Sequence, residues 1–287
     1  MTEQETKYCK TEDFTDKKEI LFHYILSPQE KKHLSDIIYD VINKYDSSEK
    51  SIKFVSSKTD DYKNLLSSLE KFFTENKGSY FIRLSTLSPK DSYYYLNRTP
   101  NSDSDSDSEE EKTESIDDVR KRLEILKVSS PMECIQVLLH SHRVFCDLES
   151  ESIGQIGIIL TKWLNIKYNT ETRCYVKNKK LLAFSQYYTD CDDYYHHLDI
   201  DKFYTNICDF IEALVKDKNK VPYENAIIDV CYLDDGKELH MIEINNYDQN
   251  TDSCLYSWEE LEKFDAKDNP KFRFKTNGEI IDYEIES

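Results

Sequence analysis

Three oxygen-bearing side chains in the C-terminal third of the sequence have the types and spacing of a cation site. They are Asp229, Glu243 and Asn245. Carboxylate and amide oxygens suit Mg²⁺, and two carboxylates with one amide would hold an ion that carries a nucleotide phosphate. Because the chain is rich in acids, the alternative is that these residues lie on a solvated outer face without a ligand.

A predicted β-hairpin decides whether the carboxylates meet. β-prone runs at residues 226–232 and 238–244 flank Asp234-Asp235-Gly236, a sequence typical of a tight turn. Side chains alternate between the two faces of a strand, so Glu243 and Asn245 share one face. The position of the partner carboxylate then depends on the length of the turn.

The two possible turn lengths place Asp229 differently. A two-residue loop puts Asp229 opposite Ile242, on the face away from Glu243. A three-residue loop puts Asp229 opposite Met241 and makes it a diagonal neighbour of Glu243 on one face, roughly 7–8 Å apart at Cα. The cation site requires this second arrangement.

The blocks around the hairpin resemble a known family. They read I-I-D-V-C-Y, M-I-E-I-N-N-Y and T-D-S-C-L-Y-S-W-E-E-L, in this order. They are similar to F-D-V-Y, I-D-F-N-P-F and T-D-S-L-L-F-x-W-E-E-L of the cell division cycle protein 123 family. Glu243 stands where the family has Asp, and Asn246 replaces the Pro. The resemblance implies an ATP-grasp-like fold and a factor that assembles eukaryotic translation initiation factor 2.

An upstream strand carries a cation. The run 78–85 reads as a strand in which Arg83 faces away from Ile82 and Leu84. A cation there needs an anionic ligand, or else lies on an edge strand and reaches water. The block R-L-S-T-L-S-P-K-D-S is similar to the family's K-L-N-W-S-S-P-R-D-A. This resemblance implies that the block binds ATP through Arg83, Ser85, Ser88, Lys90 and Asp91.

Two further blocks extend the expected ATP site. The sequence I-L-T-K-W resembles the family's L-x-L-R-K-W beside the adenine, which implies contacts from Lys162 and Trp163. Residues 171–186 read as a hairpin that turns at Asn178-Lys179, similar to E-F-R-C-F-V-x-N-x-K-L-I-A-I-S-Q-R. This block keeps Arg173, but Tyr187 stands where the family has its next Arg. One candidate phosphate contact is therefore missing, which indicates weaker ATP binding.

Composition excludes several classes of protein. The chain has 287 residues and a net charge of -18, with a pI of about 4.9. Such a charge argues against nonspecific nucleic-acid binding, which needs a basic surface. The N-terminus lacks the apolar segment of a signal peptide, and no apolar run has membrane-spanning length. Eight Cys without a C-x-x-C pair indicate reduced thiols in the cytoplasm.

Two regions are expected along the chain. Residues 1–77 should form an N-terminal helical region, with a capping box at Ser27-Pro28-Gln29-Glu30, and residues 78–287 the ATP-grasp-like region. Residues 101–118 are mostly serine and acidic residues, so we predict a disordered acidic insert.

A second cation site is an alternative at residues 191–201. Asp192–His196 and Asp193–His197 are i,i+4 pairs that would suit Zn²⁺ on a helix. They suit an ordinary exposed helix start equally well.

The resemblance thus implies an α+β, ATP-grasp-like fold with two lobes around a nucleotide cleft. The resemblance implies a monomeric, cytoplasmic assembly factor that binds ATP and Mg²⁺ and acts on the gamma subunit of eukaryotic translation initiation factor 2, without nucleic acid or membrane. Asp229, Glu243 and Asn245 would hold the Mg²⁺. We expect binding rather than turnover of ATP. The alternatives are an ATP-grasp ligase that activates a carboxylate and a degenerate interaction module without nucleotide.

Overall fold

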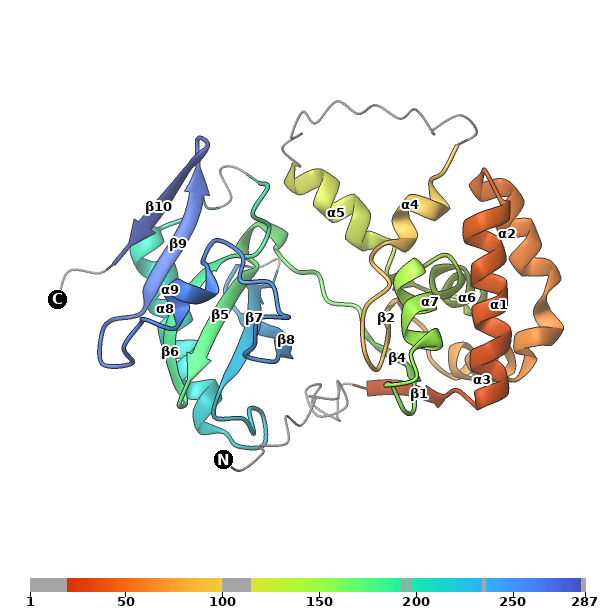
Figure 1. Ribbon diagram of the computed structural model, residues 1–287, viewed down its shortest axis with the longest axis horizontal. Coiled ribbons are helices and arrows are strands. Elements are labelled where there is room, and N and C mark those ends of the chain that lie inside the picture. The colour runs from red at the N-terminus through yellow and green to blue at the C-terminus, as the bar shows by residue number, and fades with distance from the viewer. Residues whose placement is uncertain (1–19, 100–114, 192–194, 196–197, 234–235, 285–287) are drawn as a thin grey trace. The chain divides into compact units, whose positions relative to one another are not determined.

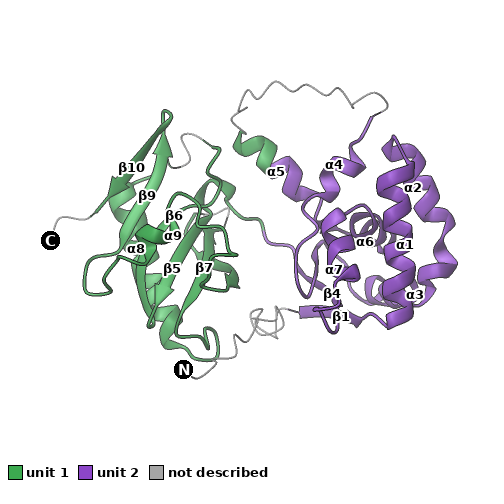
Figure 2. Cartoon of the chain, in the orientation of Figure 1, with its two compact units in different colours: residues 1–16, 111–119, 165–287 green, residues 17–110, 120–164 purple. Residues whose placement is uncertain are grey.

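Two compact units make up the protein. The computed structural model describes residues 20–99, 115–191, 195, 198–233 and 236–284. One unit falls within residues 17–110 and 120–164 and the other within 111–119 and 165–287 (Figure 2). We call them the N-terminal and the C-terminal unit. We expected a division between residues 77 and 78, but the strand that follows belongs with the preceding helices because it pairs inside their sheet.

The N-terminal unit places helices against a four-stranded antiparallel sheet of order β1-β4-β2-β3. Phe22 of β1 and Tyr80 of β2 pack on Phe72 of α3, with ring centroids 5.4 and 4.9 Å apart. One face of the sheet is therefore the helix-packing face (Figure 1). The elements are β1 (Ile20–Ile25), α1 (Pro28–Lys44), α2 (Ser48–Ser57), η2 (Thr59–Tyr62), α3 (Lys63–Glu75), β2 (Tyr80–Leu84), α4 (Ser92–Leu96), β3 (Lys127–Val128), α6 (Pro131–Leu139), α7 (His142–Glu149) and β4 (Gly157–Lys162).

Local sequence signals explain where these helices start. Ser27 accepts from the amide of Glu30, whose side chain binds the Ser27 amide in return, so the predicted capping box at α1 is confirmed.

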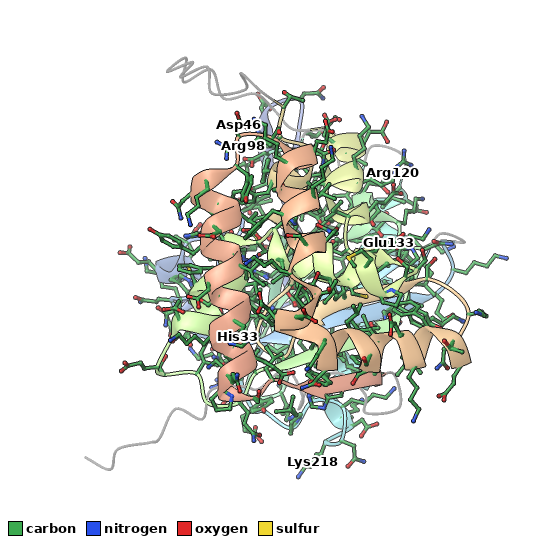
Figure 3. The ribbon with its side chains drawn as sticks, turned by 90° about the vertical axis from the view of Figure 1, so that its right-hand side faces the viewer. His33, Asp46, Arg98, Arg120, Glu133 and Lys218 are labelled. Carbon is green, nitrogen blue, oxygen red and sulfur yellow. The ribbon has the colours of Figure 1, made fainter. Side chains whose placement is uncertain are left out.

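Arg98, after α4, donates from Nη1 to the Tyr45 carbonyl at 3.2 Å and lies beside Asp46 (Figure 3). This contact ties the end of the described α4 segment to the turn between α1 and α2.

The C-terminal unit is built on a six-stranded sheet of order β10-β9-β6-β5-β7-β8. Its neighbouring strands are antiparallel except β6 and β9, which are parallel. The predicted hairpin at Asn178-Lys179 is confirmed, and both residues have the positive φ that a tight hairpin turn requires. The elements are η3 (Tyr168–Thr170), β5 (Thr172–Lys177), β6 (Lys180–Gln186), α8 (Ile200–Lys216), β7 (Ala226–Tyr232), β8 (Leu239–Asn245), α9 (Trp258–Leu261), β9 (Lys271–Thr276) and β10 (Glu279–Tyr283).

The segment after β8 covers the middle of this sheet. Tyr256 and Leu261 pack with Tyr175 of β5, Ala183 of β6 and Ile227 of β7 in one buried cluster. Every residue of β7 is buried, so both faces of this strand are covered. The face that carries the predicted cation ligands is therefore not a solvated outer face at β7.

Two sequence predictions concern residues that lie partly or wholly outside the described part of the chain. Helix α5 (Ile116–Glu124) begins inside the stretch 101–118, so the acidic insert ends before residue 116 rather than at Asp118. Residues 101–114 lie outside the described residues, as do Asp192, Asp193, His196 and His197 of the zinc alternative. Among the described residues, no helix is long and apolar enough to span a membrane.

Candidate functional site

The β7–β8 hairpin places Asp229 directly opposite Glu243. Near the turn Val230 pairs with Met241, but the register shifts between Val230 and Asp229, and Ile242 takes no partner. This bulge moves Asp229 from the position opposite Ile242 to the position opposite Glu243. Directly paired residues of antiparallel strands project from the same face.

The predicted geometry is therefore right in one respect and wrong in another. Asp229 and Glu243 share a face, as the cation site requires. Neither turn length gave the correct partner, because both assumed an unbroken ladder up to Asp229. The turn sequence carries no signal for a bulge that lies several residues away from it.

Arg173 binds the carboxylate of Asp229 with both branches of its guanidinium. These two residues are paired across β5 and β7, and Nε and Nη2 donate to Oδ1 and Oδ2 at 2.8 and 2.7 Å. Arg173 is 4% exposed and Asp229 is fully buried. A buried carboxylate in this setting needs its partner, because an unpaired charge in the interior is costly.

Other contacts hold the guanidinium from the remaining sides. Nη1 of Arg173 donates to the carbonyl of Asp252 at 2.7 Å, and the Tyr187 ring stacks on the guanidinium with 4.8 Å between Cζ and ring centroid. Burial alone would lower the pKa of Arg173, but the charge and the hydrogen bonds of Asp229 raise the pKa above the usual arginine value. Arg173 is thus a permanent, immobilised cation.

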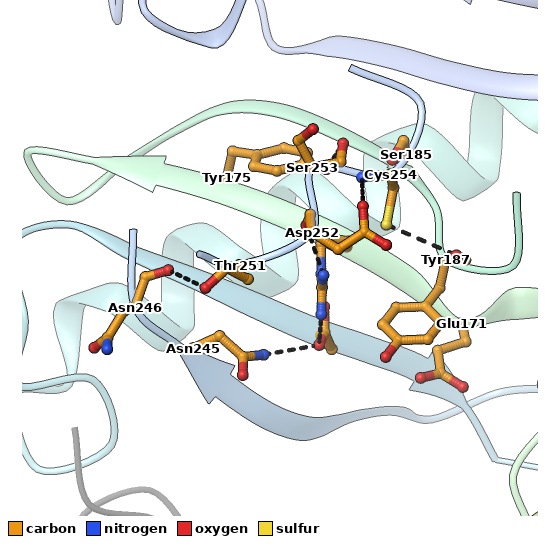
Figure 4. Close-up of polar contacts among 12 residues, drawn as sticks. Glu171, Tyr175, Ser185, Tyr187, Asn245, Asn246, Thr251, Asp252, Ser253 and Cys254 are labelled. Carbon is orange, nitrogen blue, oxygen red and sulfur yellow. Dashed lines mark hydrogen bonds and ion pairs between the residues drawn. The ribbon is translucent and has the colours of Figure 1, made fainter. Parts of the chain in front are cut away.

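Asn245 completes the group at the strand end. Its Nδ2 donates to Oδ2 of Asp229 at 3.0 Å, and Figure 4 shows the amide pointing at this carboxylate. The expected ligands Asp229, Glu243 and Asn245 are therefore brought together on one face of the β7–β8 pair.

The loop after β8 closes over this group. Thr251 Oγ1 donates to the carbonyl of Asn246 at 2.9 Å, and Tyr175 donates its hydroxyl to the carbonyl of Ser253 at 2.5 Å (Figure 4). Cys254 has a positive φ of 49°, its Sγ lies 3.7 Å from the Tyr187 carbonyl, and burial raises the thiol pKa to about 12. The conformation of this loop presents the Asp252 carbonyl to Arg173.

The sequence did not reveal the roles of Tyr187 and Asp252. In the sequence, Tyr187 is distinguished only as the replacement of an expected arginine. Asp252 belongs to the T-D-S block and has no predicted role. The Asp252 contact uses a backbone carbonyl, which has no side-chain signature. The aromatic residue at 187 was the available signal, since tyrosine rings commonly stack on arginine.

The remaining predicted ATP contacts lie in the N-terminal unit. Arg83 is on a strand paired on both sides and is only 9% exposed, so the alternative of an edge arginine reaching water is wrong. Its Nε donates to the Leu84 carbonyl at 3.1 Å. Ser85 Oγ accepts from the Gly157 amide at 3.0 Å, and Ser88 is buried.

Asp91 has a clear local role at the start of α7. Its carboxylate accepts from Ser141 Oγ at 2.6 Å and from the Arg143 amide at 3.1 Å. Such bonds satisfy amides at a helix N-terminus and anchor the loop that carries Lys90. At the end of β4, Lys162 is exposed and Trp163 is half-buried against Phe81.

The C-terminal group fits Mg²⁺ in the chemistry of its donors. Two carboxylates and one amide supply the hard oxygens that Mg²⁺ prefers. The present contacts compete with such an ion, because Arg173 occupies both oxygens of Asp229 and Asn245 presents its N–H rather than its oxygen. Among the described residues, no cluster of three or more His, Cys, Asp or Glu suits a metal. A cation here would therefore depend on the Asn245 amide.

The architecture defines a mixed α+β protein with two sheets, and comparison with known proteins gives its family. The profile of the D123 family matches residues 10–285. The chain belongs to the D123 family.

Relatives and a solved structure agree with this assignment. The chain is 32% identical over 126 residues to the translation initiation factor eIF2 assembly protein of Schizosaccharomyces pombe, covering 43% of this chain and 37% of that one. The protein of the same name from Xenopus tropicalis is 30% identical over 133 residues, covering 43% and 38%. The alignments thus span less than two fifths of these relatives.

The solved structure of Cdc123 from Schizosaccharomyces pombe covers 91% of this chain and 92% of its own, with a TM-score of 0.56 and 22% identity. This likeness shows a shared fold.

Proposed function

We propose that this protein is an assembly factor for eukaryotic translation initiation factor 2 that binds ATP with Mg²⁺ and acts on the gamma subunit. Family membership and the names of the relatives support the assembly role. The net charge of -18 favours a basic patch on the partner and an association rate that falls as salt rises.

The observation that carries the nucleotide part is the direct pairing of Asp229 with Glu243, with Asn245 in contact. These residues would hold Mg²⁺, which would offset the negative charge of the triphosphate in an acid-rich site. Arg173 already contacts Asp229 and would bind a phosphate oxygen through its planar fork.

Other parts of the expected site stay predictions. These are the ATP-grasp-like character, the nucleotide cleft, the monomeric state, the cytoplasmic location and the ATP contacts of Arg83, Ser85, Ser88, Lys90, Asp91, Lys162 and Trp163. We propose binding without turnover, since the residues assigned to the site include no Ser–His or Cys–His pair.

A second candidate is a degenerate interaction module without nucleotide. One observation favours it: Asp229, Asp252 and Tyr187 together occupy the guanidinium of Arg173, as expected for a purely structural arginine. The two candidates differ in whether Mg-ATP affects partner binding.

The test is a pull-down of purified gamma subunit by this protein with and without Mg-ATP. We expect a complex that Mg-ATP strengthens, with no steady release of phosphate. Glu243→Gln should remove the strengthening, whereas Glu238→Gln, an equal charge change at an exposed position before β8, should keep it. A complex that ignores Mg-ATP supports the interaction module, and no complex with the gamma subunit contradicts the proposal.

A further inference from the structure

We infer that Arg173 is a built-in substitute for the divalent cation: it holds Asp229 while the metal is absent and releases it when the metal binds. This inference rests on the proposed function. Arg173 would compete with the metal for Asp229 but bind the nucleotide phosphate, so its effect on metal affinity should be opposite in sign to its effect on nucleotide affinity.

The first argument is the competition for oxygens. Nε and Nη2 of Arg173 bind one oxygen each of Asp229, and Asn245 Nδ2 adds a second bond to Oδ2. All three N–H donors bring partial positive charge to the Asp229 carboxylate, as a bound metal ion would. The group therefore mimics a cation-bound site, and a real cation must displace at least part of it.

The second argument is that Arg173 keeps two supports that do not depend on Asp229. The Asp252 carbonyl accepts from Nη1, and the Tyr187 ring supports the guanidinium face. When Arg173 releases Asp229, these contacts keep the guanidinium in the site rather than letting it swing away. Nε and Nη2 are then free to donate to an anion, which a nucleotide phosphate would supply.

The third argument concerns Asn245. Its Nδ2 donates to Oδ2 of Asp229 in this structure. A cation at Asp229 repels an N–H and attracts the amide oxygen, so half a turn of this amide converts a hydrogen-bond donor into a metal ligand. Release of Arg173 and reversal of Asn245 thus belong to the same change.

A second arginine of the same sheet supplies a matched control. Arg273 of β9 is paired across the strands with Asp282 of β10, donates from Nε to its Oδ1 at 2.7 Å and stacks on Tyr256 at 4.3 Å. It thus repeats the arginine–aspartate–tyrosine arrangement of Arg173. No contact in the described residues joins it to Asp229, Glu243 or Asn245.

The experiment titrates Mn²⁺, as a paramagnetic substitute for Mg²⁺, into nucleotide-free protein and follows free Mn²⁺ by electron paramagnetic resonance. Arg173→Met should bind Mn²⁺ at least about tenfold more tightly than the unmodified protein, because a charge-assisted competitor is gone. Arg173→Lys keeps the charge but not the planar fork, so its Mn²⁺ affinity should lie between those of Arg173→Met and the unmodified protein. This conservative variant provides a second measurement if Arg173→Met does not fold. Arg273→Lys should bind Mn²⁺ with the same affinity as the unmodified protein.

A second arm measures Mg-ATP binding by calorimetry, where both Arg173 variants should bind more weakly. Equal or weaker Mn²⁺ binding by both Arg173 variants overturns the inference, even where the unmodified protein binds Mg-ATP. Failure of the unmodified protein to bind Mg-ATP counts against the proposed function instead.

Discussion

Arg173 and Asp229 form a two-pronged ion pair in the interior of the C-terminal unit, with N–O distances of 2.8 and 2.7 Å. The pair joins β5 to β7, and the Asp252 carbonyl extends it to the loop after β8. One buried pair thus links two strands and the loop that covers them.

Breaking this pair should destabilise the protein strongly. Arg173→Met leaves a fully buried carboxylate without its cation, and we expect a loss of about 3–5 kcal/mol in the free energy of unfolding. The more accessible pair Lys177–Glu262, with a half-buried lysine at the end of β5 and an exposed glutamate, is the control, and Lys177→Met should cost about 0–1 kcal/mol. Urea denaturation measures both, and equal losses would contradict a central role for the buried pair.

Much of the fold could be predicted from local sequence signals. The capping box at Ser27, the hairpin at Asn178-Lys179 and the strand Ala226–Tyr232 depend on residues close together in the chain. A shared face for Asp229 and Glu243 was one of two alternatives, tied to a three-residue loop, and the structure reaches it through a bulge instead. The partner of Asp229 was not predicted, because the bulge at Ile242 depends on packing between strands rather than on the turn.

Contacts between distant residues set the rest of the site. The pairing of Arg173 with Asp229 requires the antiparallel register of β5 and β7, which are far apart in the sequence. The sequence therefore marked both residues as separate ligands of a nucleotide site, and only their register shows that they bind each other.

Asp91 should contribute to stability through α7. Asp91→Ala removes acceptors from Ser141 Oγ and from the Arg143 amide, and we expect a loss of about 1 kcal/mol in the free energy of unfolding. Asp209→Ala, at an exposed position in α8, should stay within about 0.5 kcal/mol of the unmodified protein. Thermal or urea unfolding compares the two variants. If Asp91→Ala leaves the free energy of unfolding unchanged, Asp91 does not stabilise the start of α7.

Buried His140 should make stability fall in mild acid. Its ring nitrogens contact the Gln136 carbonyl at 2.8 Å and Ser51 Oγ at 2.9 Å, and burial lowers the pKa to about 4 from the usual 6.5. Between these values the unfolded chain binds more protons than the folded one. The contribution of His140 is therefore complete above about pH 6.5 and is lost progressively down to about pH 4, about 3 kcal/mol in total.

His140→Gln should flatten this part of the pH profile of the unfolding free energy. His142→Gln, which changes an exposed histidine at the start of α7, is the control variant. A His140→Gln variant with the slope of the unmodified protein would show that other groups cause the loss in acid.

The melting temperature with and without Mg-ATP tests the central claim most directly. A ligand that binds only the folded state adds about 2.7 kcal/mol at 100 times its dissociation constant, so Mg-ATP should raise the melting temperature of the unmodified protein. Glu243→Gln should abolish most of this rise because it removes a carboxylate paired with Asp229, and the exposed control Glu238→Gln should retain it. No rise at millimolar Mg-ATP, or an equal rise in the Glu243→Gln variant, would contradict a nucleotide site at Asp229, Glu243 and Asn245.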